Sequence, residues 1–413
     1  MALDSGAQVI VQHPCASGPT CRAFRGLGEV TPAWFCVWPW HAADAPRAEA
    51  LGNELADALR AFSANAREEV APCGGLGYVG CHAADVPSCS KILLVVFGAG
   101  VLTAQRLLPP MWEDADPSFR VVPILGPGAG TVSPPPGLNL LNGIGWSPGD
   151  RQAVVQMLRA GNLMSNRPRI FVSYQRSEAE AISYQIFDRL NRLGFEVFLD
   201  RFSIEPGVDF QVRLAEELAN MGTVLVIESR SILRSRWVRH EVDFARMHRL
   251  GLVALHLPGG RRVQGLSLRL DLAREDLSPR RGEIRARKLI AVLTWLQMAH
   301  AQAERRRIAY LRDNLSDVLL RHGFTAQGFD PAGILVARKT TNEYAFRLSN
   351  LPPELQDFHA VEGFRAGRSG AFVVAPGKYM DWRRRQPLDW LSRESRIGLE
   401  DEGDMVSMVA RLP

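Results

Sequence analysis

The sequence has no apolar run long enough to cross a lipid bilayer. Its most apolar stretch, residues 92–101, is interrupted by Gly98 and Gly100, whereas a membrane-spanning helix needs about 20 consecutive apolar residues. Residues 1–14 also lack the basic start and the sustained apolar core of a secretory signal. We therefore expect a chain without a transmembrane helix that remains in the cytoplasm.

Cysteine is absent beyond residue 89. The six cysteines are Cys15, Cys21, Cys36, Cys73, Cys81 and Cys89. In a secreted chain such a cluster would predict disulfides, but a reducing cytoplasm favours free thiols. The last three cysteines, with His13 or His82, could instead bind zinc, although their spacing lacks the CxxC pattern of zinc sites. Structural thiols are the favoured interpretation, and we expect no metal site.

Lysine is scarce, and arginine carries almost all of the positive charge. The formal net charge is +5 over 413 residues. A basic surface can bind phosphates or nucleic acid, but so small a charge on so long a chain is typical of a solvated surface. The composition, 46% hydrophobic and 23% charged, is that of an ordinary globular protein. The length predicts two or three domains.

The first predicted domain, residues 1–164, alternates strand-like apolar runs with segments of helical periodicity. The expected strands are residues 9–12, 34–38, 92–97 and 120–124, and the expected helices are residues 46–62 and 150–160. A segment rich in glycine and proline at 126–137 is expected to be a loop. Alternation of this kind favours an α/β fold with a parallel sheet.

The second predicted domain, residues 167–299, alternates strand and helix strictly. The expected strands are residues 169–174, 195–199, 223–228 and 252–257, and the expected helices are 177–193, 209–220 and 236–250, with a loop at 200–208. Such alternation predicts a doubly wound parallel sheet. Residues 91–102 and 120–128 resemble residues 223–233 and 252–260, so the first domain could repeat the same fold.

The third predicted domain, residues 300–413, starts within a long helical stretch and continues as α+β. A helix is expected at residues 315–322 and strands at 334–338, 344–348 and 371–375. Residues 328–348 faintly resemble restriction-endonuclease-like folds, in which Asp330 and Glu343 would hold Mg²⁺. The lysine position of that motif is not filled, so we do not expect a nuclease. The basic run at 380–386 is expected to be a surface face.

Three motifs in the second domain point to a known family. They are RIFVSYQRSE (169–178), VFLDRFSIEPGVDF (197–210) and SRWVRHEV (235–242). The first resembles the first-strand signature of TIR (Toll/interleukin-1 receptor) domains, the second their second strand and BB loop, and the third the helix that holds their catalytic glutamate. Together, in this order and spacing, they identify the segment as a member of the TIR family. The resemblance implies a flavodoxin-like fold and extends to TIR enzymes that cleave NAD⁺, including those of bacterial antiphage defence.

In TIR domains that cleave NAD⁺, an aromatic residue and the catalytic glutamate stand four positions apart. Trp237 and Glu241 have this spacing, which places both on one face of a helix. The resemblance therefore implies that Glu241 is the catalytic residue. The substrate-binding residues that it implies are Tyr174, Arg176, Asp200, Phe202, Ser203, Ile204 and Trp237.

The chemistry of NAD⁺ cleavage suits a site with one carboxylate. Nicotinamide leaves the ribose as a neutral base, so no general acid is needed to protonate it, unlike in an ordinary glycosidase. Glu241 would stabilise the developing oxocarbenium charge, Trp237 would offer a flat wall to a ring, and Arg176 would pair with phosphate. NAD⁺ is then the substrate, and no cofactor is expected. The alternative for Glu241 and Arg176 is a solvated surface, and for Trp237 and Tyr174 simple packing.

The expected function is an NAD⁺ glycohydrolase that releases nicotinamide and either linear or cyclic ADP-ribose. The resemblance implies a bacterial immune effector that forms a homo-oligomer through TIR–TIR contacts. Its activator, a nucleotide, nucleic acid or phage protein, would bind a flanking domain. The first domain is expected to be a degenerate TIR-like or flavodoxin-like repeat without catalysis, because Trp112 and Glu113 are adjacent and cannot share a helix face. The alternative function is a TIR interaction module that signals by association without turnover.

Overall fold

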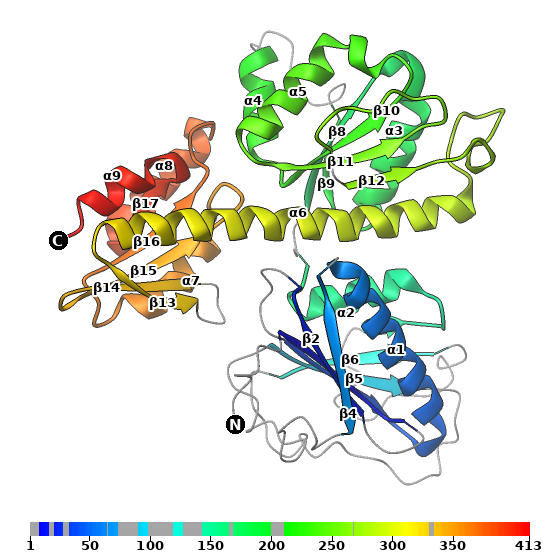
Figure 1. Ribbon diagram of the computed structural model, residues 1–413, viewed down its shortest axis with the longest axis horizontal. Coiled ribbons are helices and arrows are strands. Elements are labelled where there is room, and N and C mark those ends of the chain that lie inside the picture. Colours follow the sequence, from blue (N-terminus) through cyan, green and yellow to red (C-terminus); the bar gives the residue numbers. More distant parts are fainter. Residues whose placement is uncertain are drawn as a thin grey trace. The chain divides into compact units, whose positions relative to one another are not determined.

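The computed structural model describes residues 8–15, 20–27, 33–63, 65–72, 90–97, 119–126, 143–164, 168–199, 210–266, 268–329 and 334–413. The chain divides into two compact units, Met1–Asn166 (unit 1) and Arg167–Pro413 (unit 2) (Figure 1). No helix within the described residues has both the length and the apolar character of a membrane span. Outside the described residues lie Cys73, Cys81, Cys89, Trp112, Glu113 and Asp330.

Unit 1 is an α/β unit built on a mixed sheet. The strands are β1 (Val9–His13), β2 (Thr20–Arg25), β3 (Ala33–Pro39), β4 (Arg67–Pro72), β5 (Ser90–Phe97), β6 (Phe119–Leu125) and β7 (Ile144–Gly145), and the helices are α1 (Ala45–Phe62) and α2 (Arg151–Ala160). Among the described residues the strand order is β4-β2-β1-β3-β5-β6-β7. β1, β3, β5, β6 and β7 run parallel, whereas at one edge β2 is antiparallel to β1 and β4 is antiparallel to β2. The fully buried Leu51, Leu55 and Leu59 form the inner face of α1.

Unit 2 begins with a sheet of parallel strands. The strands are β8 (Arg169–Tyr174), β9 (Glu196–Leu199), β10 (Thr223–Glu228), β11 (Gly251–His256) and β12 (Leu268–Asp271), and the helices are α3 (Arg176–Arg192), α4 (Phe210–Ala219), α5 (Arg236–Met247) and α6 (Ala286–Arg321). The strand order β12-β11-β10-β8-β9 is the flavodoxin-like, doubly wound order that the sequence predicts. The order reverses between β8 and β10, and such a reversal opens a crevice at the carboxyl ends of the two strands.

Alternate residues of β8 face two separate cores. Ile170, Val172 and Tyr174 lie in the core that also contains residues of α3 and α6, whereas Phe171 lies in the core that contains residues of α4 and α5. Ser173 follows the same alternation and therefore points toward the side of α5. The parallel sheet is thus covered by helices on both faces, as parallel sheets generally are.

The similarity between unit 1 and the predicted TIR domain that the sequence suggests is seen in one pair of neighbouring strands. β5 pairs with β6 in parallel, as β10 pairs with β11, and these are the segments whose sequences resemble one another. However, the sheet of unit 1 differs from the sheet of the predicted TIR domain, because its parallel strands lie side by side in chain order, β1-β3-β5-β6-β7, and the strand on the other side of β1 is the antiparallel β2. Sequence similarity in two buried strands indicates a shared pair of parallel strands, but it does not determine the order of the remaining strands.

A second sheet completes unit 2. The strands are β13 (Thr325–Phe329), β14 (Ile334–Lys339), β15 (Asn342–Leu348), β16 (Gly370–Ala375) and β17 (Gly398–Asp401), and the helices are α7 (Leu355–Arg365), α8 (Trp382–Ser395) and α9 (Met405–Ala410). Neighbouring strands are antiparallel from β13 to β15 and parallel from β15 to β17. The start of α6 buries Leu289 and Leu296 in the core of the first sheet, and its end buries Leu311 and Leu319 in the core of the second. The boundary predicted at residue 300 therefore lies inside one continuous helix.

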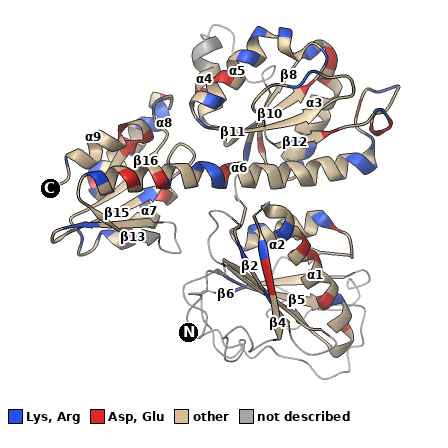
Figure 2. Ribbon diagram, in the orientation of Figure 1, with Lys and Arg blue, Asp and Glu red and all other residues tan. Residues whose placement is uncertain are grey.

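The basic run that was predicted to be a surface face lies at the start of α8. This helix has no buried residue. Arg384 donates a hydrogen bond to Asn220 Oδ1 at 2.8 Å, and Arg385 pairs with Asp389 at 3.4 Å. Basic and acidic residues are interspersed along the helices (Figure 2), which agrees with a solvated surface rather than a continuous basic groove.

Candidate active site

A cavity of about 410 Å³ lies at the carboxyl end of β8, beside the first turns of α5. It is lined by Val172, Tyr174, Gln175, Arg176, Ser235, Trp237, Val238 and Glu241. The predicted site residues that the structure describes therefore surround one cavity. In doubly wound folds, ligands bind at the carboxyl ends of the strands where the strand order reverses, and this cavity lies at that position.

Glu241 lies at the cavity with its side chain buried. The helix that carries it begins at Ser235, whose Oγ accepts a hydrogen bond from the Val238 amide at 3.3 Å, as an N-cap residue does. Glu241 is only 3% exposed, and Ser173 Oγ donates a hydrogen bond to its Oε2 at 2.5 Å. A buried carboxylate needs such donors to offset its lost hydration. The alternative of a glutamate on a solvated helix face is therefore wrong.

Trp237 precedes Glu241 by one helical turn and lines the same cavity. Its exposed fraction is 48%, so the alternative in which Trp237 is a core residue is also wrong. A half-exposed indole beside a cavity offers a flat apolar surface on which a planar ring can stack.

Tyr174 and Arg176 occupy opposite kinds of position. Tyr174 is buried at the end of β8 and packs in the core, as expected for a packing residue. It also lines the cavity. Arg176 is exposed and is the first residue of α3. A helix start favours an anion, because its amide groups are unpaired and the helix dipole is positive there. The guanidinium and the helix start together suit a phosphate.

The remaining predicted residues, Asp200, Phe202, Ser203 and Ile204, lie outside the described residues. A family model with the description "TIR domain" matches residues 170–290. Residues 170–290 form a TIR domain. A search of curated proteins finds no match.

The chain is similar to several solved structures. The TIR domain of the Toll-related receptor TRR-2 from Hydra magnipapillata is 16% identical, with 30% of this chain and 96% of that chain covered and a TM-score of 0.24. The TIR domains of the activated Roq1 resistosome, which recognises the pathogen effector XopQ, are 15% identical over 33% of this chain and 83% of that chain, with a TM-score of 0.21. Protein VC1899 from Vibrio cholerae is 8% identical over 59% of this chain and 96% of that chain, with a TM-score of 0.20.

Ser173 is a residue of the TIR site that the sequence analysis missed. It is a hydroxyl residue within the otherwise apolar run of β8 and is 1% exposed. A buried hydroxyl requires a hydrogen-bond partner, and alternation along the strand directs Ser173 toward α5. The hydroxyl in an apolar run and the strand alternation are visible in the sequence, and they hint at a polar contact on the side of α5 without naming Glu241.

A second carboxylate in the TIR domain is fully occupied by hydrogen bonds. Glu228 at the end of β10 is 0% exposed and accepts from Arg269 through both oxygens, at 2.8 and 2.9 Å. It also accepts from the Val263 amide at 2.7 Å and bonds His256 Nδ1 at 2.9 Å. This network joins the ends of β10, β11 and β12. Glu228 therefore stabilises the fold and has no free oxygen to offer a substrate.

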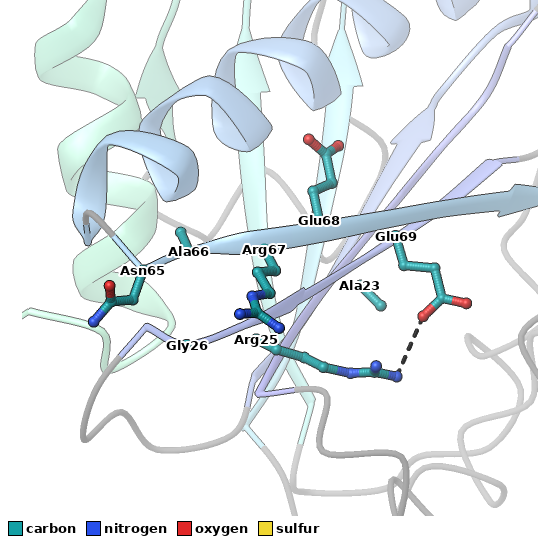
Figure 3. A pocket seen from close by; sticks show the side chains of 8 residues that line it. All are labelled: Ala23, Arg25, Gly26, Asn65, Ala66, Arg67, Glu68 and Glu69. Atoms are coloured by element: carbon teal, nitrogen blue, oxygen red, sulfur yellow. Dashed lines mark ion pairs between the residues drawn. The ribbon is translucent and has the colours of Figure 1, made fainter.

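The parts that flank the TIR domain also contain a cavity and a residue considered for metal binding. In unit 1, a cavity of about 590 Å³ lies beside β2 and β4, and there Arg25 and Glu69 reach toward each other (Figure 3) and pair at 3.2 Å. Gly26 fits because its φ is +71° and a Cβ would lie 2.2 Å from the Asn65 carbonyl oxygen. In the C-terminal sheet, Glu343 approaches Arg368 at 3.8 Å. No group of three or more potential metal ligands occurs within the part of the chain that the structure describes.

Proposed function

We propose that the TIR domain cleaves NAD⁺ at the nicotinamide–ribose bond, with Glu241 as the catalytic carboxylate. The observation that carries this proposal is the placement of a buried glutamate, bonded to Ser173, at a cavity that an indole also lines. The products are nicotinamide and either linear or cyclic ADP-ribose. NAD⁺ is the substrate, and the reaction requires no cofactor.

The geometry supports a dissociative reaction. The bond between ribose C1′ and the nicotinamide nitrogen breaks, and its electron pair returns to the pyridine ring, which leaves as a neutral base. The ribose becomes an oxocarbenium ion, whose positive charge the Glu241 carboxylate stabilises in a low-dielectric site. Water then adds to C1′ and loses a proton, which gives ADP-ribose. If a nitrogen of the adenine adds to C1′ instead, the product is cyclic.

The other residues at the cavity would hold the substrate. Trp237 would stack against a ring of the dinucleotide, and the Arg176 guanidinium with the start of α3 would bind its pyrophosphate. Tyr174 would form the wall at the end of β8. These contacts fix the ribose beside Glu241, and holding the reacting groups in place supplies a large part of an enzymatic rate enhancement.

A TIR interaction module without turnover is the second candidate function. It is favoured by the 48% exposure of Trp237, because exposed aromatic residues are common at protein interfaces. One assay decides between the two functions. The purified full chain is incubated at high concentration with NAD⁺, and nicotinamide is measured by chromatography. Self-association without nicotinamide above the buffer blank would establish the interaction module and reject the enzyme.

We further propose a cytoplasmic role in bacterial immunity, with activation by homo-oligomerisation. An enzyme that empties the NAD⁺ pool damages its host, so the free chain should rest with an incomplete site. In related TIR enzymes a neighbouring BB loop completes the pocket, and the corresponding residues 200–208 lie outside the described residues. The trigger, a nucleotide, nucleic acid or phage protein bound by a flanking part, would offset the ordering cost of assembly.

Nicotinamide release per subunit is expected to rise with protein concentration. The measurement is a dilution series with size-exclusion traces alongside, for the wild type and for a Pro206→Asp, Gly207→Arg double variant. The variant should stay at a low, flat rate, because a charged, bulky loop cannot seat in the neighbouring subunit. A monomer with a concentration-independent rate that the loop changes do not alter would refute activation by assembly.

Ser173→Ala is expected to lower kcat about tenfold and to leave KM nearly unchanged. A hydrogen bond to a charged group contributes about 1.5–3 kcal/mol, and Ser173 acts by positioning Glu241 rather than by binding substrate. Ser173→Thr keeps the hydroxyl and should recover most of the rate. Ser183→Ala is the matched control, because Ser183 is fully buried but bonds the Glu180 carbonyl within α3. Equal losses in Ser173→Ala and Ser183→Ala would indicate a general effect on folding.

A further inference from the structure

A second cavity of unit 2, of about 290 Å³, lies where the TIR domain meets the C-terminal sheet. We call it the junction cavity. It is lined by the end of α5 and the residues after it, by α6 near Arg307 and Tyr310, and by residues 376, 378–380 and 401–403. It is separate from the site of Glu241, but both cavities are built on the same helix, α5.

Aromatic rings form part of the wall of the junction cavity. His248 and Tyr379 meet edge to face, with ring centroids 5.0 Å apart and planes at 89°, and Tyr310 lines the cavity from α6. Phe244, from α5, contacts both His248 at 4.3 Å and Tyr379 at 5.3 Å between ring centroids. Such rings offer faces and edges to a planar ligand.

Two cations of the junction cavity lack a carboxylate partner among the described residues. The Arg249 guanidinium lies 4.0 Å from the centroid of the Tyr310 ring, and Lys378 Nζ lies 5.6 Å from that of Tyr379. Each therefore lies beside an aromatic ring. A ligand that combines a planar ring with an anionic group would satisfy both kinds of feature.

The acidic residues of the junction cavity are already bonded. Asp401 accepts hydrogen bonds from the Gly377 amide at 2.7 Å and from the Gly403 amide at 2.8 Å. Glu402 accepts from Arg307 Nη2 through both oxygens, each at 2.9 Å. The cavity lining has three cations, Arg249, Arg307 and Lys378, and two carboxylates, Asp401 and Glu402, so its formal charge is +1.

His248 lines the junction cavity with a neutral imidazole ring. Its Nε2 is buried and has no hydrogen-bond partner among the described residues. Burial, together with the nearby Arg307 and Lys378 charges, lowers the pKa of the imidazole, so the ring is neutral at neutral pH and one nitrogen can accept a hydrogen bond. A buried polar atom without a partner is costly.

Arg249 holds an unusual backbone conformation. Its φ is +52°, a left-handed position that glycine commonly fills after a helix end. An arginine is strained there, and strain of this kind is found disproportionately at functional sites. Arg249 follows directly after α5 and its C-cap His248, and its guanidinium lies over the Tyr310 ring of α6.

α5 connects the junction cavity with the candidate active site. Arg307 donates a hydrogen bond to the His248 carbonyl at the end of this helix, and Phe244 packs on Tyr379 of the C-terminal part. Trp237 and Glu241 lie in the first half of the same helix. A shift of α5 at His248 would therefore also move the Glu241 carboxylate.

We propose that the junction cavity binds a mononucleotide, with the base against Tyr310 and Tyr379 and the phosphate between Arg249 and Lys378, and that the bound nucleotide acts on Glu241 through α5. The second half rests on the proposed function. Ligand pockets begin at roughly 300 Å³, so a cavity of about 290 Å³ suits one nucleotide rather than a dinucleotide. Arginine and lysine provide the phosphate contacts, and the tyrosines provide stacking.

Binding is tested by isothermal titration calorimetry on the full chain carrying Glu241→Gln, the variant in which we expect nicotinamide release to be about 10²-fold slower or more. The probes are AMP and GMP, with inorganic phosphate and adenosine separating the contributions of phosphate and ring. We expect saturable binding of a mononucleotide, weakened at least tenfold by Lys378→Glu and by Arg249→Glu. Both side chains are exposed, so the folding of these variants should be preserved, and circular dichroism checks this. Arg280→Glu, at an exposed arginine outside the cavity, is the matched control.

Three results would overturn the binding proposal. The first is that no saturable binding is seen at millimolar nucleotide, and the second is that phosphate alone binds as tightly as AMP and GMP. The third is that Arg176→Glu in the candidate active site weakens nucleotide binding whereas Lys378→Glu does not. The coupling is measured separately on the wild type. Saturating mononucleotide should change kcat for nicotinamide release severalfold, and Lys378→Glu should remove that change. If the wild type releases no nicotinamide, the proposed function fails while the calorimetry still decides whether the junction cavity binds.

Discussion

Glu241→Gln is expected to lower nicotinamide release by about 10²-fold or more while the fold is retained. Glutamine keeps the size of the side chain, and its amide oxygen can still accept the hydrogen bond from Ser173. It removes the negative charge that opposes the oxocarbenium ion, and loss of one such preorganised electrostatic group costs about 10²- to 10³-fold in typical enzymes. The measurement is kcat for nicotinamide release, with thermal denaturation as the check on folding.

The matched control for Glu241→Gln is Asp243→Asn on the same helix. The Asp243 side chain is 69% exposed and pairs with Arg246 at 3.3 Å. Asp243→Asn changes the charge of α5 by as much as Glu241→Gln does. It should nevertheless leave the rate of nicotinamide release near that of the wild type, since exposed ion pairs contribute little. A wild-type rate for Glu241→Gln would show that Glu241 is a structural residue and that the cavity has another use. An equal loss in both variants would point to the charge of α5 as a whole.

The sequence predicts the central strands of the TIR domain well because they are buried on both faces. β8 and β10 have the predicted bounds, 169–174 and 223–228, and every residue in them is buried. Strands of this kind are continuous apolar runs. β12 and β4 are missed, because their residues are partly or largely exposed and edge strands lack that signal. α8 is missed for a related reason: it buries no residue and contains Pro387.

The sequence predicts the candidate active site only as far as local spacing reaches. Trp237 and Glu241 are one turn apart on one helix, so their common face follows from helical geometry. The hydrogen bond from Ser173 to Glu241 joins residues 68 positions apart, and only strand alternation hints at it. The junction cavity joins the end of α5, the middle of α6 and two later loops. No periodicity relates these segments, so the sequence does not reveal that they meet.

Arg307→Met is expected to lower the unfolding free energy of unit 2 by about 3–5 kcal/mol at pH 8. Arg307 is 4% exposed, bonds both oxygens of Glu402 and donates to the His248 carbonyl and to the Asn350 carbonyl at 3.1 Å. Removing one partner of a buried ion pair costs about this much, because the other charge is left without compensation. Differential scanning calorimetry of the full chain gives the change as a shift of the unit 2 transition.

The loss in Arg307→Met should shrink as the pH falls. Burial raises the pKa of Glu402, and the Arg307 charge partly opposes that rise. Because the pKa is higher in the folded chain than in the unfolded chain, this group favours folding most below its unfolded pKa, and that contribution is lost as the pH rises through the folded pKa. Without Arg307 the pKa of Glu402 in the folded chain rises further, so Glu402 stays protonated over a wider range of pH. At pH 5 more of the Glu402 is protonated, so the unpaired charge disappears and the variant regains stability.

Two further variants separate the ion pair from the packing of the arginine side chain. Arg307→Met with Glu402→Leu replaces both charges by apolar groups, and such replacements are often neutral or stabilising, so most of the loss at pH 8 should be recovered. Arg312→Met, on the same helix but bonded to the 68% exposed Asp313, should change stability by no more than about 0.5 kcal/mol. A loss in Arg307→Met that is the same at pH 5 and pH 8, or that the double variant does not recover, would assign the effect to the bonds with the two carbonyls. The hydrogen bonds from Arg307 to the His248 and Asn350 carbonyls, rather than the ion pair between Arg307 and Glu402, would then stabilise the end of α5.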